Sequence, residues 1–185
     1  MVYEIEKRSL LNKKQFEELK NYLDKNTKFN NQTEMKSFLF QEPNFLRIRI
    51  VKGNNIVFIT TKSGNYNDIA RKEINIKVKK DEFDYYLNKL IKQGYTECSL
   101  VKTKRKTYTI DKIKIELNEI DYLGLIVEVE ATTEDKSKIN ELEQRVINIM
   151  EKLSLKKLPA DKYQNMMDKM YSKTLKSVNE QIFSF

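Results

Sequence analysis

The sequence contains no histidine, so it lacks the side chain that most often serves as a catalytic base or a metal ligand. This absence excludes Ser-His and Cys-His nucleophilic catalysis and every histidine-ligated metal site. Any metal must be held by oxygen atoms, which favours magnesium, manganese or calcium. The single cysteine, Cys98, excludes an internal disulfide and is typical of a cytoplasmic protein. We expect Cys98 to be a small buried apolar residue.

Long apolar runs are also missing. No segment approaches the ~20 apolar residues of a membrane-spanning helix. The first residues carry charges where a secretory signal needs an apolar stretch. We therefore expect a cytoplasmic protein that does not associate with a membrane.

Charge is abundant, because 34% of the 185 residues are charged and only 39% are hydrophobic. A chain of this length suits one domain spanning residues 1–185, with either a very polar surface or a polar interior. The net charge of +8 allows an anionic partner such as nucleic acid, phosphate or an acidic membrane. A lysine-rich surface also arises from solubility alone, so net charge decides little.

Alternating polar and apolar residues predict a chain made largely of strands. The expected strands cover residues 2–10, 35–40, 45–51, 56–62, 71–78, 95–104 continuing into 105–110, 113–120 and 124–131. A tight hairpin is expected at residues 53–55, and loops are expected at 26–31 and 64–68.

Four helices are expected between and after these strands. Asn12 and Gln15 form a capping-box pattern at the start of the first helix. Asp81 is expected to cap the second helix, and Gly94 to end it. Two C-terminal helices are expected within residues 133–185, separated by a break at 158–160.

Charged residues share one face of several expected strands, since alternate side chains point the same way. In the opening strand, Glu4, Glu6 and Arg8 lie on one face. Two interpretations remain open: the charged faces meet water, or the sheet closes into a barrel whose interior they line. Apolar helix stripes that need a partner, and the segregation of acidic from basic strands, favour the barrel. Such an interior would hold a divalent cation at the glutamates and a polyphosphate at the basic residues.

Six motifs, in order across residues 3–130, resemble those of the CYTH superfamily of triphosphate tunnel metalloenzymes. That superfamily includes class IV adenylyl cyclases, thiamine triphosphatases, inorganic triphosphatases and fungal-type RNA triphosphatases. The segments that carry the resemblance are Glu4-Ile5-Glu6-Lys7-Arg8, Leu46-Arg47-Ile48-Arg49, Ile59-Thr60-Thr61-Lys62, Arg71-Lys72-Glu73-Ile74-Asn75, Lys102-Thr103-Lys104 and Leu123-Gly124 through Glu128-Val129-Glu130.

The resemblance implies an α+β fold: a closed antiparallel β-barrel of about eight strands that forms a tunnel, with helices packed on its outside. It also implies activity on a triphosphate with Mg²⁺ or Mn²⁺. For hydrolysis, the absence of histidine favours a water bound to the metal or oriented by a carboxylate as the nucleophile. The implied metal ligands are Glu4, Glu6, Glu73, Glu128 and Glu130. The implied triphosphate-binding residues are Arg8, Arg47, Arg49, Lys62, Arg71, Lys102 and Lys104. The implied catalytic residues are Glu4, Glu6 and Arg8.

Two positions depart from the family pattern, because Asn75 and Asn118 stand where carboxylates are usual. An amide is a poorer ligand for a hard cation, so metal affinity or rate is expected to fall. Glu116 lies on the same strand face as Asn118 and is a candidate to compensate. Arg105 competes with Lys104 for the family's arginine position, and strand alternation is taken to favour Lys104.

The sequence does not indicate a purine pocket, since it lacks tryptophan and the segment 26–36 is polar. We therefore expect triphosphate hydrolysis, with a class IV-type adenylyl cyclase and a non-catalytic polyphosphate- or nucleotide-binding module as alternatives. The expected partner is a small molecule that bears a triphosphate. Nucleic acid is not expected, because basic and aromatic residues are not interleaved. A homodimer is an open alternative.

Overall fold

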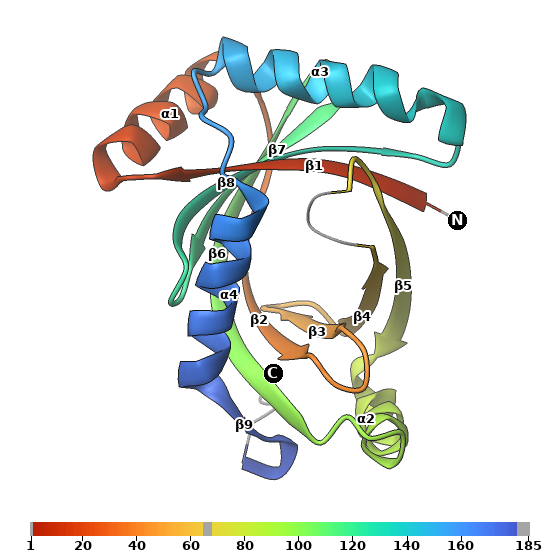
Figure 1. The fold of residues 1–185 in the computed structure, drawn as a ribbon. Helices are drawn as coiled ribbons and strands as arrows, with labels where there is room; N and C mark the ends of the chain where they lie inside the picture. Colours follow the sequence, from red (N-terminus) through yellow and green to blue (C-terminus); the bar gives the residue numbers. More distant parts are fainter. Residues whose placement is uncertain (1, 65–67, 181–185) are drawn as a thin grey trace.

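Eight antiparallel strands close into a barrel in a computed structural model that describes residues 2–64 and 68–180 (Figure 1). Around the barrel the strand order is β2, β3, β4, β5, β1, β8, β7 and β6, and β6 pairs again with β2. The strands are β1 (Val2–Leu11), β2 (Lys28–Phe40), β3 (Leu46–Val51), β4 (Ile56–Ser63), β5 (Arg71–Lys79), β6 (Glu97–Ile110), β7 (Ile113–Ile120) and β8 (Gly124–Thr133). The predicted α+β barrel is confirmed.

The pairing of β2 with β6 closes the sheet into a barrel and extends over most of both strands. Its register runs from Lys28 opposite Thr109 to Leu39 opposite Ser99, with an irregularity between Phe29 and Asn31. The prediction of a loop over residues 26–31 was therefore wrong, because β6 supplies the hydrogen bonds that make this polar segment a strand. The residues predicted as two strands, 95–104 and 105–110, form one continuous β6.

Helices pack on the outside, as predicted. Helix α1 (Lys13–Asn26) and helix α3 (Ile139–Lys152) cover β1, β7 and β8 with an apolar cluster that includes Ile5 and Val146. Helix α2 (Phe83–Lys92) covers the β3–β4 side of the barrel through Phe83. Helix α4 (Ala160–Thr174) packs beside β6 and β8, and Figure 1 shows it running along the front of the barrel.

Local signals explain several element boundaries. The Asn12 side chain accepts from the Gln15 backbone and Gln15 caps in return, so the predicted capping box is confirmed. Gly53, with a φ of 76°, is the third residue of the tight β3–β4 turn, in which the Asn54 N–H donates to the Val51 carbonyl. The prediction that Asp81 caps α2 was wrong, because a short 3₁₀ turn over Lys80–Glu82 precedes the helix and no side chain caps it.

One strand was not predicted, and two short parts of the chain lie outside the described residues. A short strand, β9 (Leu175–Ser177), extends the sheet from β6 after the last helix. Residues 65–67 of the predicted loop over 64–68, and residues 181–185 of the C-terminal segment, lie outside the described residues. No helix of the described residues is long and apolar enough to cross a membrane.

Candidate active site

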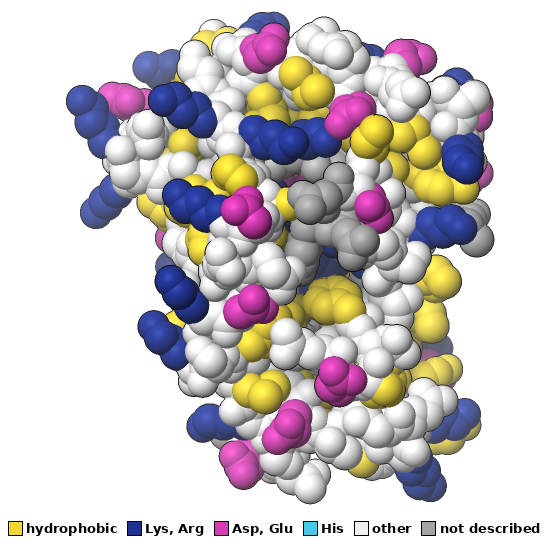
Figure 2. Space-filling model, in the orientation of Figure 1, with side chains coloured by type: hydrophobic (Ala, Val, Ile, Leu, Met, Phe, Trp, Pro, Cys, Tyr) yellow, Lys and Arg dark blue, Asp and Glu magenta, His cyan; other side chains and the backbone are white. Residues whose placement is uncertain are grey.

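The inner face of the barrel carries the charged side chains. Strands β1 and β8 contribute facing rows, since Glu6 lies opposite Glu130 and Arg8 lies opposite Glu128. A central hollow of about 150 Å³ is lined by charged residues from seven of the strands. Figure 2 shows a depression near the middle of the molecule, with basic side chains visible inside it. The predicted charged interior is therefore present.

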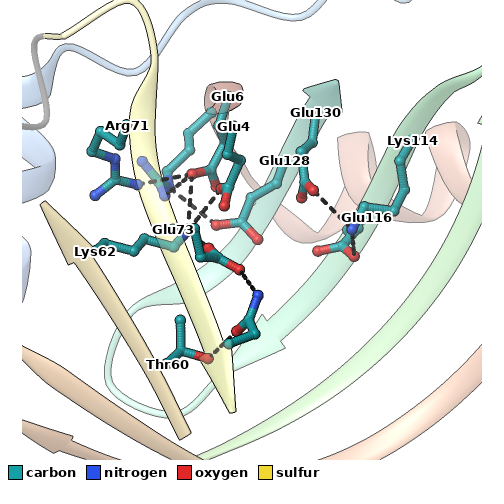
Figure 3. Close-up of polar contacts among 12 residues, drawn as sticks. Glu4, Glu6, Thr60, Lys62, Arg71, Glu73, Lys114, Glu116, Glu128 and Glu130 are labelled. Atoms are coloured by element: carbon teal, nitrogen blue, oxygen red, sulfur yellow. Dashed lines mark hydrogen bonds and ion pairs between the residues drawn. The ribbon is translucent and has the colours of Figure 1, made fainter. Parts of the chain in front are cut away.

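On one wall, carboxylates of β1 and β5 surround Lys62 of β4. The Lys62 Nζ atom lies 2.7 Å from Glu4 Oε1 and 3.0 Å from Glu73 Oε2. Arg71 Nη2 lies 3.1 Å from Glu6 Oε2. Figure 3 shows these side chains pointing toward one another across the strands. The short pairing of β1 with β5, which joins Val2–Glu4 to Arg71–Glu73, brings them together.

Burial and neighbouring groups shift the pKa values of Glu4 and Glu73 in opposite directions. Burial, a hydrogen bond with Glu73 and the nearby charge of Glu6 raise the pKa of Glu4 to about 9. Burial also opposes ionisation of Glu73, but hydrogen bonds from Glu4 and Asn75 and the charge of Lys62 hold its pKa below the usual value. The opposite pKa shifts favour a proton on Glu4 and a negative charge on Glu73 at neutral pH.

Glu6 has a different environment. It is buried, which disfavours its charge, but Arg8, Lys62 and Arg71 hold its pKa well below the usual range. Arg8 connects this residue to the next wall, because its Nη2 donates to Glu6 and its Nε donates to Glu128 Oε1 at 3.0 Å. The Arg8 guanidinium carbon also lies 4.4 Å from the Tyr163 ring centroid of α4. Arg8 is thus held on three sides.

On the opposite wall, β6, β7 and β8 place Arg105 and Lys114 among three glutamates. Arg105 forms ion pairs with Glu116 and, at 3.2 Å, with Glu128. Lys114 Nζ lies 3.1 Å from Glu116 Oε1 and 3.0 Å from Glu130 Oε1. Burial opposes the charge of Arg105, but these carboxylates outweigh it and raise the pKa of Arg105.

Two arginines in the hollow differ from the others. Among the described residues, Arg47 and Arg49 of β3 make no ion pair, and the Nε atom of each is buried without a hydrogen-bond acceptor. Burial and the neighbouring charges of Arg47 and Arg105 lower the pKa of Arg49 to about 9. A buried donor without an acceptor is costly, so an anion that accepted from these two Nε–H groups would remove that cost.

A family model supports what this geometry indicates. The model of the CYTH domain matches residues 2–162 of the chain. The chain belongs to the CYTH domain family. A Methanocaldococcus jannaschii protein named "Putative adenylate cyclase" is 25% identical over 112 residues, which cover 60% of this chain and 63% of the relative. The aligned region thus spans slightly less than two thirds of that relative's length.

Solved structures share the fold of this CYTH domain. The PH1819 protein of Pyrococcus horikoshii OT3 is 23% identical, with a TM-score of 0.74, and the match covers 90% of this chain and 98% of that one. A Hippeastrum protein described as a "putative adenylyl cyclase" with "a dominant" triphosphatase activity is 14% identical, with a TM-score of 0.61, covering 91% and 96%. At these identities the similarity shows the fold alone.

Two predicted substrate-binding residues of this CYTH domain lie outside the hollow. Lys102 and Lys104 are exposed and line a groove on the outer surface, whereas Arg105 lines the hollow. Choosing Lys104 over Arg105 from strand alternation was wrong. Tyr108, which is fully buried in the outer core, has the same parity as Lys102 and Lys104. That apolar residue was the available signal that even-numbered side chains of β6 point outward.

The other predicted site residues of β1, β3, β4, β5 and β8 do line the hollow. Sequence reasoning considered Arg105 but preferred Lys104, and it missed Lys114 and Tyr163 as lining residues. Lys114 carries no motif signal. Tyr163 comes from the C-terminal helix, and only the folded chain brings that helix beside β1, where the Leu158 backbone N–H donates to the Arg8 carbonyl at 2.7 Å.

The contrast between Arg105 and Lys104 is testable. We expect Arg105→Gln to weaken binding of inorganic triphosphate by roughly 10- to 100-fold, because a charged hydrogen-bond donor facing the phosphates is lost. We expect Lys104→Gln to leave the affinity within about twofold, since an exposed lysine contributes little. Isothermal titration calorimetry measures the affinity of both variants. A larger loss of affinity in Lys104→Gln than in Arg105→Gln would show that Lys104, not Arg105, binds the phosphates.

Proposed function

We propose that this CYTH domain hydrolyses a triphosphate with the help of a divalent cation bound inside the barrel. The observation that carries the proposal is the pair of half-buried arginines Arg47 and Arg49, which make no ion pair among the described residues and whose Nε atoms are buried without an acceptor, in one hollow with the glutamates. Bidentate arginine contacts suit phosphate oxygens. The anion that these groups require and the cation that the carboxylates attract are the two components of metal-assisted phosphoryl transfer.

The oxygen donors suit a hard divalent cation such as Mg²⁺ or Mn²⁺. The raised pKa of Glu4 favours a proton on this carboxyl, and Glu73 Oε2 is buried with an ion-pair contact to Lys62 but no hydrogen bond. A cation bound here would replace the proton of Glu4. Among the described residues, however, no three acidic side chains are already grouped to hold a metal, because each predicted metal ligand is paired with a lysine, an arginine or another carboxylate.

The residues divide the work as follows. Glu4 and Glu73 would hold the cation, with Glu6, Glu128 and Glu130 near it. When bound, the cation supplies positive charge that offsets the charge of the phosphate oxygens. Arg47, Arg49 and Arg105 bind the phosphates, and Arg8, held by Glu6 and Glu128, orients the chain of phosphates against the carboxylates. A carboxylate of this cluster orients the attacking water, since the sequence has no histidine to do so.

A product assay tests the proposal. The protein is incubated with inorganic triphosphate, thiamine triphosphate or ATP, plus Mg²⁺ or Mn²⁺, and orthophosphate, pyrophosphate and cyclic AMP are quantified. We expect orthophosphate release. Formation of cyclic AMP and pyrophosphate would contradict hydrolysis and support the adenylyl cyclase alternative. Binding without any of these products would support a non-catalytic polyphosphate-binding module.

Metal binding is expected to depend on pH. Because the pKa of Glu4 is raised to about 9, this carboxyl is protonated at neutral pH and must lose its proton before it binds a cation. We expect the apparent Mg²⁺ affinity to rise by up to roughly tenfold per pH unit between about pH 7 and 9. Calorimetry in buffers of different ionisation enthalpy measures the proton release. Glu4→Gln should abolish that release, and a pH-independent affinity in the unsubstituted protein would contradict the prediction.

A further inference from the structure

Asn118 is fully buried in the wall of the barrel, between residues of opposite charge. Its exposed fraction is 0%, although it lies on β7 among ionised side chains. The Arg105 Nε–H donates to Asn118 Oδ1 at 2.6 Å. Asn118 Nδ2 donates to Glu128 Oε2 at 3.1 Å. The side chain thus joins a cation of β6 to a carboxylate of β8.

A carboxamide is the side chain that this position requires. It accepts with one atom and donates with the other, whereas a carboxylate only accepts and an apolar side chain does neither. A carboxylate at residue 118 would face Glu128 directly and would place further negative charge beside Glu116. The amide satisfies both neighbours without changing the net charge of the wall.

The consequence for Arg105 is a fixed guanidinium plane. Its Nη1 pairs with Glu116, its Nη2 pairs with Glu128, and Asn118 accepts from Nε. Two of these partners are charged, and the third is neutral. A third carboxylate would hold the same guanidinium against the wall more strongly and would compete with a phosphate for it.

We propose that Asn118 is a positioning residue that orients Arg105 and Glu128 and, by being neutral, leaves Arg105 able to bind a phosphate group. The proposal rests on the proposed function, because it assigns Arg105 to the phosphates. It implies that the amide is part of a working site and that restoring a carboxylate at residue 118 impairs the site.

The test uses the full chain and inorganic triphosphate without metal, measured by calorimetry. We expect Asn118→Asp to weaken triphosphate binding by roughly 10- to 100-fold. In the Arg105→Gln background the same substitution should change the affinity less than about twofold, because its effect acts through Arg105. Asn148→Asp adds an equal charge on the exposed face of α3 and should leave binding unchanged. Unaltered binding by Asn118→Asp, or an equal penalty in both backgrounds, would overturn the proposal.

A second measurement does not depend on turnover, on triphosphate binding or on the folding of the aspartate variant. In the unsubstituted protein, the Arg105 Nε–H nuclear magnetic resonance signal, assigned by its loss in Arg105→Gln, should exchange slowly with water. Asn118→Leu should accelerate that exchange at least tenfold. Exchange at the solvent rate in the unsubstituted protein would refute the role of Asn118 in holding Arg105. If the protein bound no triphosphate but the slow exchange remained, the proposed function would be refuted, whereas the contact that holds Arg105 against Asn118 would stand.

Discussion

Replacing Arg47 and Arg49 together by methionine is expected to abolish triphosphate binding while raising thermal stability. Each arginine offers charged hydrogen bonds to phosphate oxygens, and such bonds contribute about 1.5–3 kcal/mol each. Loss of both should weaken binding by roughly 10²- to 10⁴-fold. Both Nε atoms are buried without an acceptor, so the folded protein loses a desolvation cost when they are removed.

The two opposite effects make this prediction specific. Calorimetry with inorganic triphosphate measures the affinity, and thermal unfolding without ligand measures the stability. The matched control replaces Lys102 and Lys104, which are exposed outside the barrel, by methionine. That control should change neither quantity much. If the double arginine variant bound triphosphate as tightly as the unsubstituted protein, Arg47 and Arg49 of β3 would not be part of the phosphate site.

Replacing Glu4 and Glu6 together by glutamine is expected to abolish turnover, by at least roughly 10³-fold, because charged oxygen ligands and the group that orients water are lost. The two single variants should separate the causes. The raised pKa of Glu4 favours its neutral form at neutral pH, so Glu4→Gln exchanges one neutral side chain for another and should preserve stability. Glu6 pairs with Arg8 and Arg71 in the interior, so Glu6→Gln should destabilise the fold by about 3–5 kcal/mol.

Turnover in the product assay and denaturant unfolding measure these effects. Glu141→Gln, on the exposed face of α3, provides a control for removal of a carboxylate. Full activity in the double variant would contradict the assignment of the β1 carboxylates to the site. A Glu6→Gln protein of unchanged stability would contradict the view that Glu6 is the centre of the ion pairs on its wall.

Most charged side chains of the hollow form ion pairs with one another. Lys62, Arg71, Arg105 and Lys114 each pair with glutamates, whereas Arg47 and Arg49 do not. Under the proposed function, a triphosphate would meet two arginines that make no ion pair among the described residues, and it would compete with carboxylates for the other basic side chains. We expect the cation and the triphosphate to bind cooperatively, since a cation at the glutamates releases the basic side chains that held them.

Alternation along single strands was predictable from the sequence. It placed Glu4, Glu6 and Arg8 on one face of β1, and Arg47 and Arg49 on one face of β3, because the side-chain period of a strand is two whatever the partner strand. It also placed aliphatic residues on the opposite faces, where the amphipathic helices pack. The family motifs carried the same information, and together they predicted the barrel and most of its charged lining.

Alternation failed in β6, where the sequence does not show which of the two strand faces points into the barrel. In β6, Lys102, Lys104 and Arg105 are all basic, and their charge does not reveal which face is buried. Pairing of β6 with β2 and β7 decides it, because Asn118 and Glu116 of β7 face Arg105. The polar start of β2 is a strand for the same reason, since its hydrogen bonds come from β6.

The sequence by itself therefore determined which side chains share a face, the apolar stripes of the helices and the oxygen-and-cation chemistry that remains when histidine is absent. Only the tertiary structure decided which walls meet across the hollow: Lys62 between Glu4 and Glu73, Lys114 between Glu116 and Glu130, and Tyr163 over Arg8. The physical reason is that face membership is a local property of the backbone, whereas these contacts depend on strand register and barrel closure, which join residues far apart in the chain.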